Sequence, residues 1–309
     1  NVLVLYDDKS THIKTIQEHL NSFRNHSRHS VQYLAATGAR SLGDWQEDLS
    51  RTILAFDVLI VHYTVRVCFD WHINPEIAEL VISFPGLKVL FIQDEYNKPG
   101  VARDVVERLE FDVIFGGVPA ESVDYVYPKS RFSGVEYVRT LTGFMPEEPG
   151  LDELVTPVAE REIRIGYRGR RLPVIYGSLG NEKYEIGRKV KHEADLRGLH
   201  TDIEVDDSRR IYGFDWFRFL ASARATLGTE SGSNVFDFDG SLQAAIEEMV
   251  DDDPEVSFEQ IYSRLLAEPE ANIRMNQISP KIFEAIRLRT ALVLFEGEYS
   301  GVVEPDVHF

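Results

Sequence analysis

Short apolar runs alternate with stretches of helical periodicity through the first half of the chain. The runs that predict buried strands are residues 1–8, 30–36, 57–63, 86–96 and 111–117. Between them, the spacing of apolar residues predicts helices at 10–23, 43–56, 75–84 and 100–110. Because short buried strands joined by helices form a parallel sheet with both faces covered, this half predicts a doubly wound α/β domain.

The alternation breaks at residues 143–154, where prolines, glycines and acids cluster as in a linker between domains. It then resumes, with predicted strands at 161–169, 200–206, 224–231 and 291–297 and predicted helices at 181–198, 215–223 and 279–290. An insertion at 241–278 carries two more predicted helices. The sequence predicts two Rossmann-like domains, 1–148 and 161–309, joined by a hinge at 149–160 and facing each other across a cleft. Since a doubly wound domain normally continues after such a last strand, we expect further elements beyond Phe309.

Composition limits the partners and the compartment. The 309 residues carry a net charge of −18, which predicts repulsion from nucleic acid and no nucleic-acid partner, although a local basic pocket for a small anion is compatible. The longest apolar runs are far shorter than the roughly 20 residues that span a bilayer. The single cysteine, Cys68, stands beside aromatic residues and predicts packing in a reducing, cytoplasmic compartment.

Glycines and basic residues gather where the strand at 161–169 ends. Gly166, Arg168 and Gly169 occupy this strand end, and Lys183 follows near the start of the next predicted helix. Small residues let the backbone approach a ligand, a helix N-terminus supplies free N–H groups, and arginine donates paired hydrogen bonds to phosphate oxygens. The pattern predicts an anion site. The alternative is a solvated loop whose arginines pair with nearby acids.

A second polar stretch ends the strand at 224–231. Ser231, Gly232 and Ser233 offer hydroxyls and backbone N–H groups, and Glu230 offers a carboxylate, for the sugar or diphosphate of a ligand. The alternative here is an ordinary polar turn. Glu284 stands alone among apolar residues of the helix at 279–290, where a carboxylate needs a helix-end N–H, an arginine or vicinal hydroxyls as its partner.

Taken in order, the two nucleotide-type domains, the Gly/Arg strand end, the lysine and the late FEA helix before ALVLFEG resemble glycosyltransferases of the GT-B fold, particularly the group-1, family 4-like class. The resemblance implies a sugar-nucleotide donor in the C-terminal domain and an acceptor in the N-terminal domain. Arg168 and Lys183 match the pair that neutralises the diphosphate. Glu284 matches the second acid of a Glu-(seven residues)-Glu motif that binds the ribose. The first acid is replaced by Asn276, so we expect Glu230 or Asn276 to take over its role.

Asp237 and Asp239 imitate the Asp-x-Asp motif that binds a metal ion in the other large glycosyltransferase fold. GT-B enzymes generally need no metal, and basic side chains are available here to neutralise phosphates. The resemblance therefore implies no metal and no tightly bound cofactor, with a nucleoside-diphosphate sugar as donor substrate. We expect the two acids to support the turn or to meet a hydroxyl-rich ligand.

Candidate catalytic residues stand at strand ends. His62 ends the strand at 57–63, Asp94 and Glu95 end the strand at 86–96, and Glu230 belongs to the second domain. Such groups accept a proton from an acceptor hydroxyl in an inverting transferase, or position the acceptor in a retaining one. The alternative is that the acids cap the following helix and the histidine is merely hydrogen-bonded. The acceptor expected from the resemblance is a hydroxyl-bearing glycan, lipid-linked molecule or small molecule of glycoconjugate biosynthesis, which allows peripheral membrane association.

The sequence thus predicts a metal-independent glycosyltransferase that uses a sugar nucleotide. Two alternatives stay open. A GT-B-like sugar-nucleotide epimerase needs paired acid and base groups but no second substrate, and a catalytically inactive module only binds a nucleotide or a glycan. Turnover of a sugar nucleotide separates an enzyme from a binding module, and dependence on an acceptor separates a transferase from an epimerase.

Overall fold

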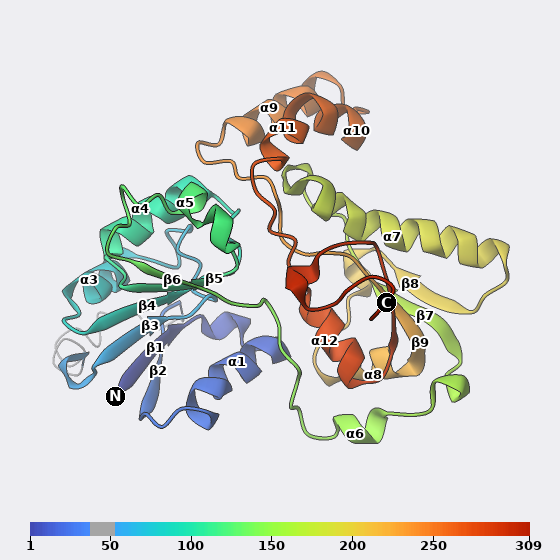
Figure 1. Ribbon diagram of the computed structural model, residues 1–309, viewed down its shortest axis with the longest axis horizontal. Helices are drawn as coiled ribbons and strands as arrows, with labels where there is room; N and C mark the ends of the chain where they lie inside the picture. Colours follow the sequence, from blue (N-terminus) through green and yellow to red (C-terminus); the bar gives the residue numbers. More distant parts are fainter. Residues whose placement is uncertain (38–52) are drawn as a thin grey trace. The chain divides into compact units, whose positions relative to one another are not determined.

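The computed structural model describes residues 1–37 and 53–309, which divide into two compact units, Asn1–Thr140 and Leu141–Phe309 (Figure 1). We call them unit 1 and unit 2. The division lies slightly before the end of the N-terminal domain expected at 148. Residues of the expected hinge form the short helix α6 (Leu151–Leu154), which packs within unit 2 against helix α8 (Phe214–Ser222).

Unit 1 contains a parallel sheet with the strand order β2-β1-β3-β4-β5-β6. Its strands are β1 (Val2–Tyr6), β2 (Val31–Ala35), β3 (Val58–Val61), β4 (Leu87–Phe91), β5 (Val113–Gly116) and β6 (Glu136–Arg139). Its helices are α1 (Lys14–Asn25), α3 (Pro75–Ser83), α4 (Pro99–Leu109) and α5 (Val123–Val126). The helix predicted at 43–56 lies largely outside the described residues, and its last part, Ile53–Ala55, is a 3-10 turn.

Elementary rules of chain geometry account for these elements. Leu5, Val61 and Leu90 are fully buried, as expected of central parallel strands that helices cover on both faces. Helix α3 begins where the side chain of Asn74 accepts a hydrogen bond from the N–H of Ile77, with a proline at its first position. The apolar periodicity in the sequence therefore places the strands and longer helices of unit 1, whereas it predicts neither β6 nor the short helix α5.

Unit 2 contains a four-stranded parallel sheet with the order β10-β9-β7-β8. Its strands are β7 (Ile163–Arg168), β8 (Thr201–Glu204), β9 (Ala223–Gly228) and β10 (Ala291–Leu294). Besides α6 and α8, its helices are α7 (Gly177–Leu196), α9 (Ser241–Asp252), α10 (Phe258–Ile261), α11 (Ala267–Glu270) and α12 (Pro280–Arg287). A π-helical turn, Tyr262–Leu266, joins α10 to α11. Among the described helices, none is long and apolar enough to cross a bilayer.

The two sheets are wound in the same way. In each unit the first strand, β1 or β7, pairs with the second strand of the unit on one side and with the third on the other. The chain therefore reverses its direction of winding beside this first strand. In open parallel sheets, ligands bind outside the carboxyl ends of the strands at such a switch point. Ligand sites are thus expected at the ends of β1 and β3 in unit 1 and of β7 and β9 in unit 2.

A buried guanidinium fixes the opposite end of the second sheet. Arg161 is 3% exposed and precedes β7. It donates hydrogen bonds to the carbonyls of Thr156, Ala223 and Leu288 at 2.9–3.2 Å and to the hydroxyl of Thr290 at 2.8 Å. One side chain therefore ties the segment before β7 to the start of β9 and to the end of α12.

We predict that Arg161→Met lowers the free energy of unfolding by about 3 kcal/mol, because it leaves several buried acceptors without a donor. Urea unfolding followed by circular dichroism measures the change. Arg164→Met is the matched control, since Arg164 is exposed on β7, the strand that directly follows Arg161. We expect it to change the free energy of unfolding by less than about 0.5 kcal/mol. Equal effects of the two substitutions would contradict the anchoring role.

Candidate functional site

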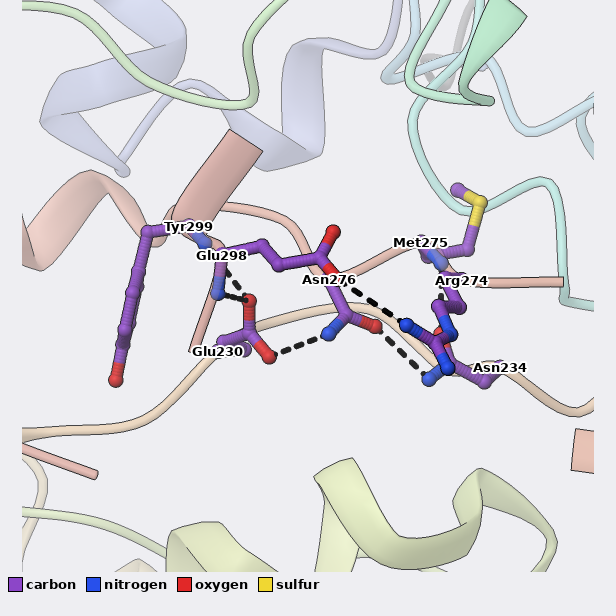
Figure 2. Close-up of polar contacts among 7 residues, drawn as sticks. All are labelled: Glu230, Asn234, Arg274, Met275, Asn276, Glu298 and Tyr299. Carbon is purple, nitrogen blue, oxygen red and sulfur yellow. Dashed lines mark hydrogen bonds and ion pairs between the residues drawn. The ribbon is translucent and has the colours of Figure 1, made fainter. Parts of the chain in front are cut away.

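The carboxylate of Glu230 organises the end of β9. It is 5% exposed, and its Oε1 accepts hydrogen bonds from the backbone N–H groups of Glu298 and Tyr299, both at 2.7 Å. Its Oε2 accepts a hydrogen bond from the side-chain amide of Asn276 at 2.6 Å. Figure 2 shows this carboxylate between the amide and the two backbone nitrogens. Three donors thus hold one buried charge, and they come from two segments distant in the sequence.

Asn276 also connects Glu230 to Asn234. Its Oδ1 accepts a hydrogen bond from the amide of Asn234 at 2.9 Å, and Oδ1 of Asn234 accepts one from the N–H of Met275 at 2.7 Å (Figure 2). Burial is the main cause that raises the pKa of Glu230. The two candidates for the role of the missing acid, Glu230 and Asn276, are therefore direct partners in the structure.

Two lysines converge between the ends of β7 and β9. Nζ of Lys183, on α7, lies 3.0 Å from the hydroxyl of Ser231. Nζ of Lys281, on α12, donates to the carbonyl of Arg168 at 2.9 Å and lies 4.2 Å from the centre of the Tyr167 ring. Burial, together with the positive charge of Lys183, lowers the pKa of Lys281 to about 7. Lys281 was missed in the sequence, where its position one turn before Glu284 was the available signal.

The guanidinium of Arg168 points toward β8 and not toward the lysines. It pairs with the carboxylate of Asp202, with two N–O distances of 2.9 Å, and donates to the carbonyls of Asp202, Tyr167 and Arg209. It also stacks 4.2 Å from the ring centre of Phe219. The structure thus brings Lys183 and Lys281 together, and it turns the predicted partner of Lys183 toward β8.

The predicted glycines and serines have different surroundings. A Cβ on Gly166 would lie 2.9 Å from the Cβ of Ala223, and one on Gly169 would lie 2.8 Å from the carbonyl oxygen of Lys183, so both positions require glycine for packing. Gly232 has a φ of 91°, in the left-handed region. Ser233 is buried and accepts a hydrogen bond from the N–H of Val235, as in a tight turn.

Glu284 lies beside the lysines on the same helix as Lys281. Its Oε2 accepts a hydrogen bond from the indole N–H of Trp216 at 2.6 Å, and its charge acts on Lys281. The apolar neighbours seen in the sequence are thus accompanied by an indole donor and a nearby ammonium group, which satisfy a carboxylate that is 8% exposed.

The start of α7 is already occupied by an anionic side chain. Glu270, which ends α11, is buried and accepts hydrogen bonds from the N–H and the hydroxyl of Ser178, at 3.0 and 2.6 Å. The helix end that the sequence pointed to as an anion site is therefore capped by the insertion. Lys183 and Lys281 remain as positively charged groups that converge at this switch point.

Asp237 and Asp239 accept hydrogen bonds from the start of helix α9. Asp237 accepts hydrogen bonds from the N–H groups of Leu242 and Gln243, and Asp239 accepts one from the N–H of Ser241. Both carboxylates cap the first turn of α9, where negative charge is favourable. Across residues 1–37 and 53–309, no group of three His, Cys, Asp or Glu side chains is arranged to hold a metal ion.

The candidate residues of unit 1 separate into exposed and buried groups. His62 is fully buried, and its Nε2 lies 2.8 Å from Nδ1 of His19 in an aromatic cluster beneath the sheet end. Glu95 is also buried and accepts hydrogen bonds from Tyr137 and from the N–H of Gly117. A cavity lies at the carboxyl ends of β1, β3 and β4. Asp94 lines this cavity, whereas His62 and Glu95 do not.

Comparisons with known proteins bear on the fold. No family profile and no curated protein matches the chain. A solved alpha-glucosyltransferase in complex with UDP is similar over 96% of this chain and 80% of that chain, with 10% identity and a TM-score of 0.51. Two alpha-glucosyltransferase complexes with UDP and a 13-mer DNA, one with a central A:G mismatch and one with an HMU base, cover 75% of this chain and 72% and 73% of theirs. Their identities are 10% and 12%, and both TM-scores are 0.46.

The chain has the GT-B fold. Two parallel, doubly wound units and the likeness to the UDP complex confirm the predicted fold class. One expectation is wrong. The net charge predicts no nucleic-acid partner, whereas three of the similar solved alpha-glucosyltransferase structures contain DNA. The physical reason is that net charge averages over the whole surface, while binding depends on the local field.

We predict that Glu230→Gln and Asn276→Asp each destabilise the protein by about 1–3 kcal/mol and that together they largely restore it. Alone, Glu230→Gln turns a new amide toward the amide of Asn276, and Asn276→Asp alone sets a new carboxylate against that of Glu230. In the double variant, the new amide donates to the new carboxylate, which still accepts from Asn234. A double-mutant cycle of unfolding free energies measures the coupling, and additive losses would contradict the network.

We predict that the stability of the protein depends on pH because of the buried carboxyl group of Glu95. Burial raises the pKa of its carboxyl group from an ordinary 4.5 to about 8. Because the unfolded chain then releases this proton at lower pH than the folded one, stability falls as pH rises from about 4.5 to 8. Glu95→Gln mimics the protonated acid, so we expect it to equal the parent at pH 5 and to exceed it by about 1 kcal/mol or more at pH 8.5. The control is Glu136→Gln, at an exposed site on β6; thermal unfolding at both pH values provides the measurement.

Proposed function

We propose that this protein is a glycosyltransferase that transfers a sugar from a nucleoside-diphosphate sugar held by unit 2 to a hydroxyl acceptor held by unit 1. The observation that carries the proposal is the approach of Lys183 and Lys281 at the β7–β9 switch point. Two ammonium groups that repel each other in a partly buried site are stabilised by a shared anion, and a diphosphate supplies one.

Polar groups around the lysines support the same ligand. Gln277 is 3% exposed and forms a β-bridge with Ser231, and its Nε2 has no hydrogen-bond partner among the described residues. A buried N–H without a partner is costly unless a ligand supplies an acceptor. A phosphate or sugar oxygen of the donor would satisfy it. In this proposal Glu284 accepts hydrogen bonds from the ribose hydroxyls.

The proposed chemistry follows from charge. When the bond from the sugar to the diphosphate breaks, negative charge grows on the leaving phosphate, and Lys183 and Lys281 stabilise it there. The acceptor hydroxyl then attacks the anomeric carbon and passes its proton to the carboxylate of Asp94. Asp94, which is exposed at the end of β4, is the remaining catalytic candidate from the sequence that can meet an acceptor. Membership in the group-1, family 4-like class belongs to the proposal as well.

We expect Lys183→Met and Lys281→Met each to weaken binding of UDP about tenfold or more, because each removes a charge-assisted hydrogen bond to phosphate. Calorimetric titration of the full chain with UDP, GDP, ADP, CMP and dTDP identifies the nucleotide first. Lys191→Met is the matched control, since Lys191 is exposed on the same helix. Loss of affinity for the control alone, or no binding of any nucleotide by the parent, would contradict the proposed donor site.

The same titration has an expected pH profile. The pKa of Lys281 is about 7, mainly because of burial, so affinity for the diphosphate falls as pH rises through and above 7 and the ammonium loses its proton. Lys281→Arg keeps its charge throughout this range. Its affinity is therefore expected to stay level between pH 6.5 and 8.5, which separates a charge effect from a structural one.

A further inference from the structure

Unit 1 contains a cavity of about 370 Å³ at the carboxyl ends of β1, β3 and β4. We call it the β1–β3 cavity, since it lies at the switch point of the first sheet. Its walls include Asp7 and Ser10 after β1, Thr64 after β3 and Gln93 after β4. Its volume lies at the lower end of the range for small-molecule sites, which suits one or two sugar rings.

A buried histidine on its wall carries an unused donor. His72 is 3% exposed, and its Nδ1 accepts a hydrogen bond from the N–H of Arg66 at 3.2 Å. Burial lowers the pKa of His72, so the ring is neutral near pH 7 and its proton sits on Nε2. This Nε2 has no partner within the described residues. A buried N–H of this kind needs an acceptor, which a ligand oxygen or an ordered water supplies.

An exposed aromatic face stands beside this donor. The side chain of Trp71 lines the cavity, and the residue is 64% exposed, unusually high for an indole. Its ring lies 3.8 Å from that of His72 and 5.7 Å from that of Phe69, centre to centre. An indole held in place by neighbouring rings offers a flat apolar surface at low entropic cost.

The remaining polar groups are suited to hydroxyls. The side-chain amides of Gln93 and Asn97 line the cavity and make no hydrogen bond within the described residues. The carboxylate of Asp7 is held by the hydroxyls of Ser10 and Thr37, and Asp94 adds a second acid. Arg66 also lines the cavity, so the lining holds two carboxylates against one guanidinium, and this net negative charge opposes an anionic ligand. The amides, the carboxylates, the guanidinium and one N–H together match the alternating donors and acceptors of a polyol.

We propose that the β1–β3 cavity binds a sugar ring of the acceptor, with Trp71 against the apolar face of the ring and Nε2–H of His72 donating to one of its hydroxyl oxygens. The role as acceptor rests on the function proposed above, whereas the choice of a saccharide rests on the cavity itself. Trp71 and His72 thereby become specificity-determining residues that the sequence did not single out as binding groups.

The test is calorimetric titration of the full chain with methyl glucoside, methyl galactoside, methyl N-acetylglucosaminide, maltose and cellobiose. We expect at least one to bind, and Trp71→Ala to weaken its binding about tenfold. His72→Asn keeps an acceptor for Arg66 N–H but loses the donor at Nε2, so it weakens binding similarly. His72→Gln keeps an N–H near Nε2, so its affinity stays within about threefold. The control Tyr212→Ala removes an exposed aromatic side chain in unit 2 and leaves binding unchanged.

Two results would overturn the inference. One is saccharide binding that is indifferent to Trp71 and His72. The other is no saccharide binding, including the case in which a 13-mer DNA duplex binds through Trp71 instead. Titration of UDP in the same samples distinguishes a failure of the proposed saccharide site from a failure of the proposed glycosyltransferase function. UDP binding without saccharide binding rejects the cavity alone, and saccharide binding through Trp71 and His72 without any nucleotide binding rejects the glycosyltransferase alone.

Discussion

The second unit depends on one buried charge, the carboxylate of Glu230. A carboxylate removed from water must be compensated by hydrogen bonds, and here two backbone N–H groups and one amide supply them. The backbone is left-handed at Asn276 and Tyr299, with φ of 37° and 46°, which residues other than glycine rarely adopt. Surrounding contacts must hold such conformations, and both residues are direct partners of this carboxylate. Glu230 thus fixes the two segments that border the lysine pair.

This constraint favours an amide over an acid at position 276. Position 276 faces the carboxylate of Glu230, so an acid there would place two negative charges against each other in a buried site. An asparagine donates to Glu230 with its nitrogen and accepts from Asn234 with its oxygen. The buried carboxylate at this point therefore belongs to Glu230, and position 276 supplies one of its donors.

Local patterns predicted most strands and the longer helices, but not the short helices α5 and α6, and long-range contacts decided the rest. Apolar periodicity marks every strand except β6, whose sequence EYVR is short and half-buried at the edge of the sheet. The loops at the strand ends were also predictable. The direction of each side chain in them was not. Arg168 turns toward Asp202 on a neighbouring strand, Lys281 reaches back to the end of β7, and His62 lies within an aromatic cluster. Each of these contacts joins residues that are distant in the sequence, so a local pattern does not predict it.

The two switch points share a physical feature beyond their topology. Each has a buried nitrogen donor without a partner in the described residues, Nε2 of Gln277 in unit 2 and Nε2 of His72 in unit 1. Folding alone would select against such groups, because each costs about 1–3 kcal/mol when it gives up water and receives no acceptor. Their retention at the carboxyl ends of two parallel sheets, where ligands of this fold class bind, is what a ligand oxygen at each position would explain. Because Gln277 and His72 belong to separate units, a substitution at either one removes a hydrogen-bond donor from one switch point and leaves that of the other unit in place.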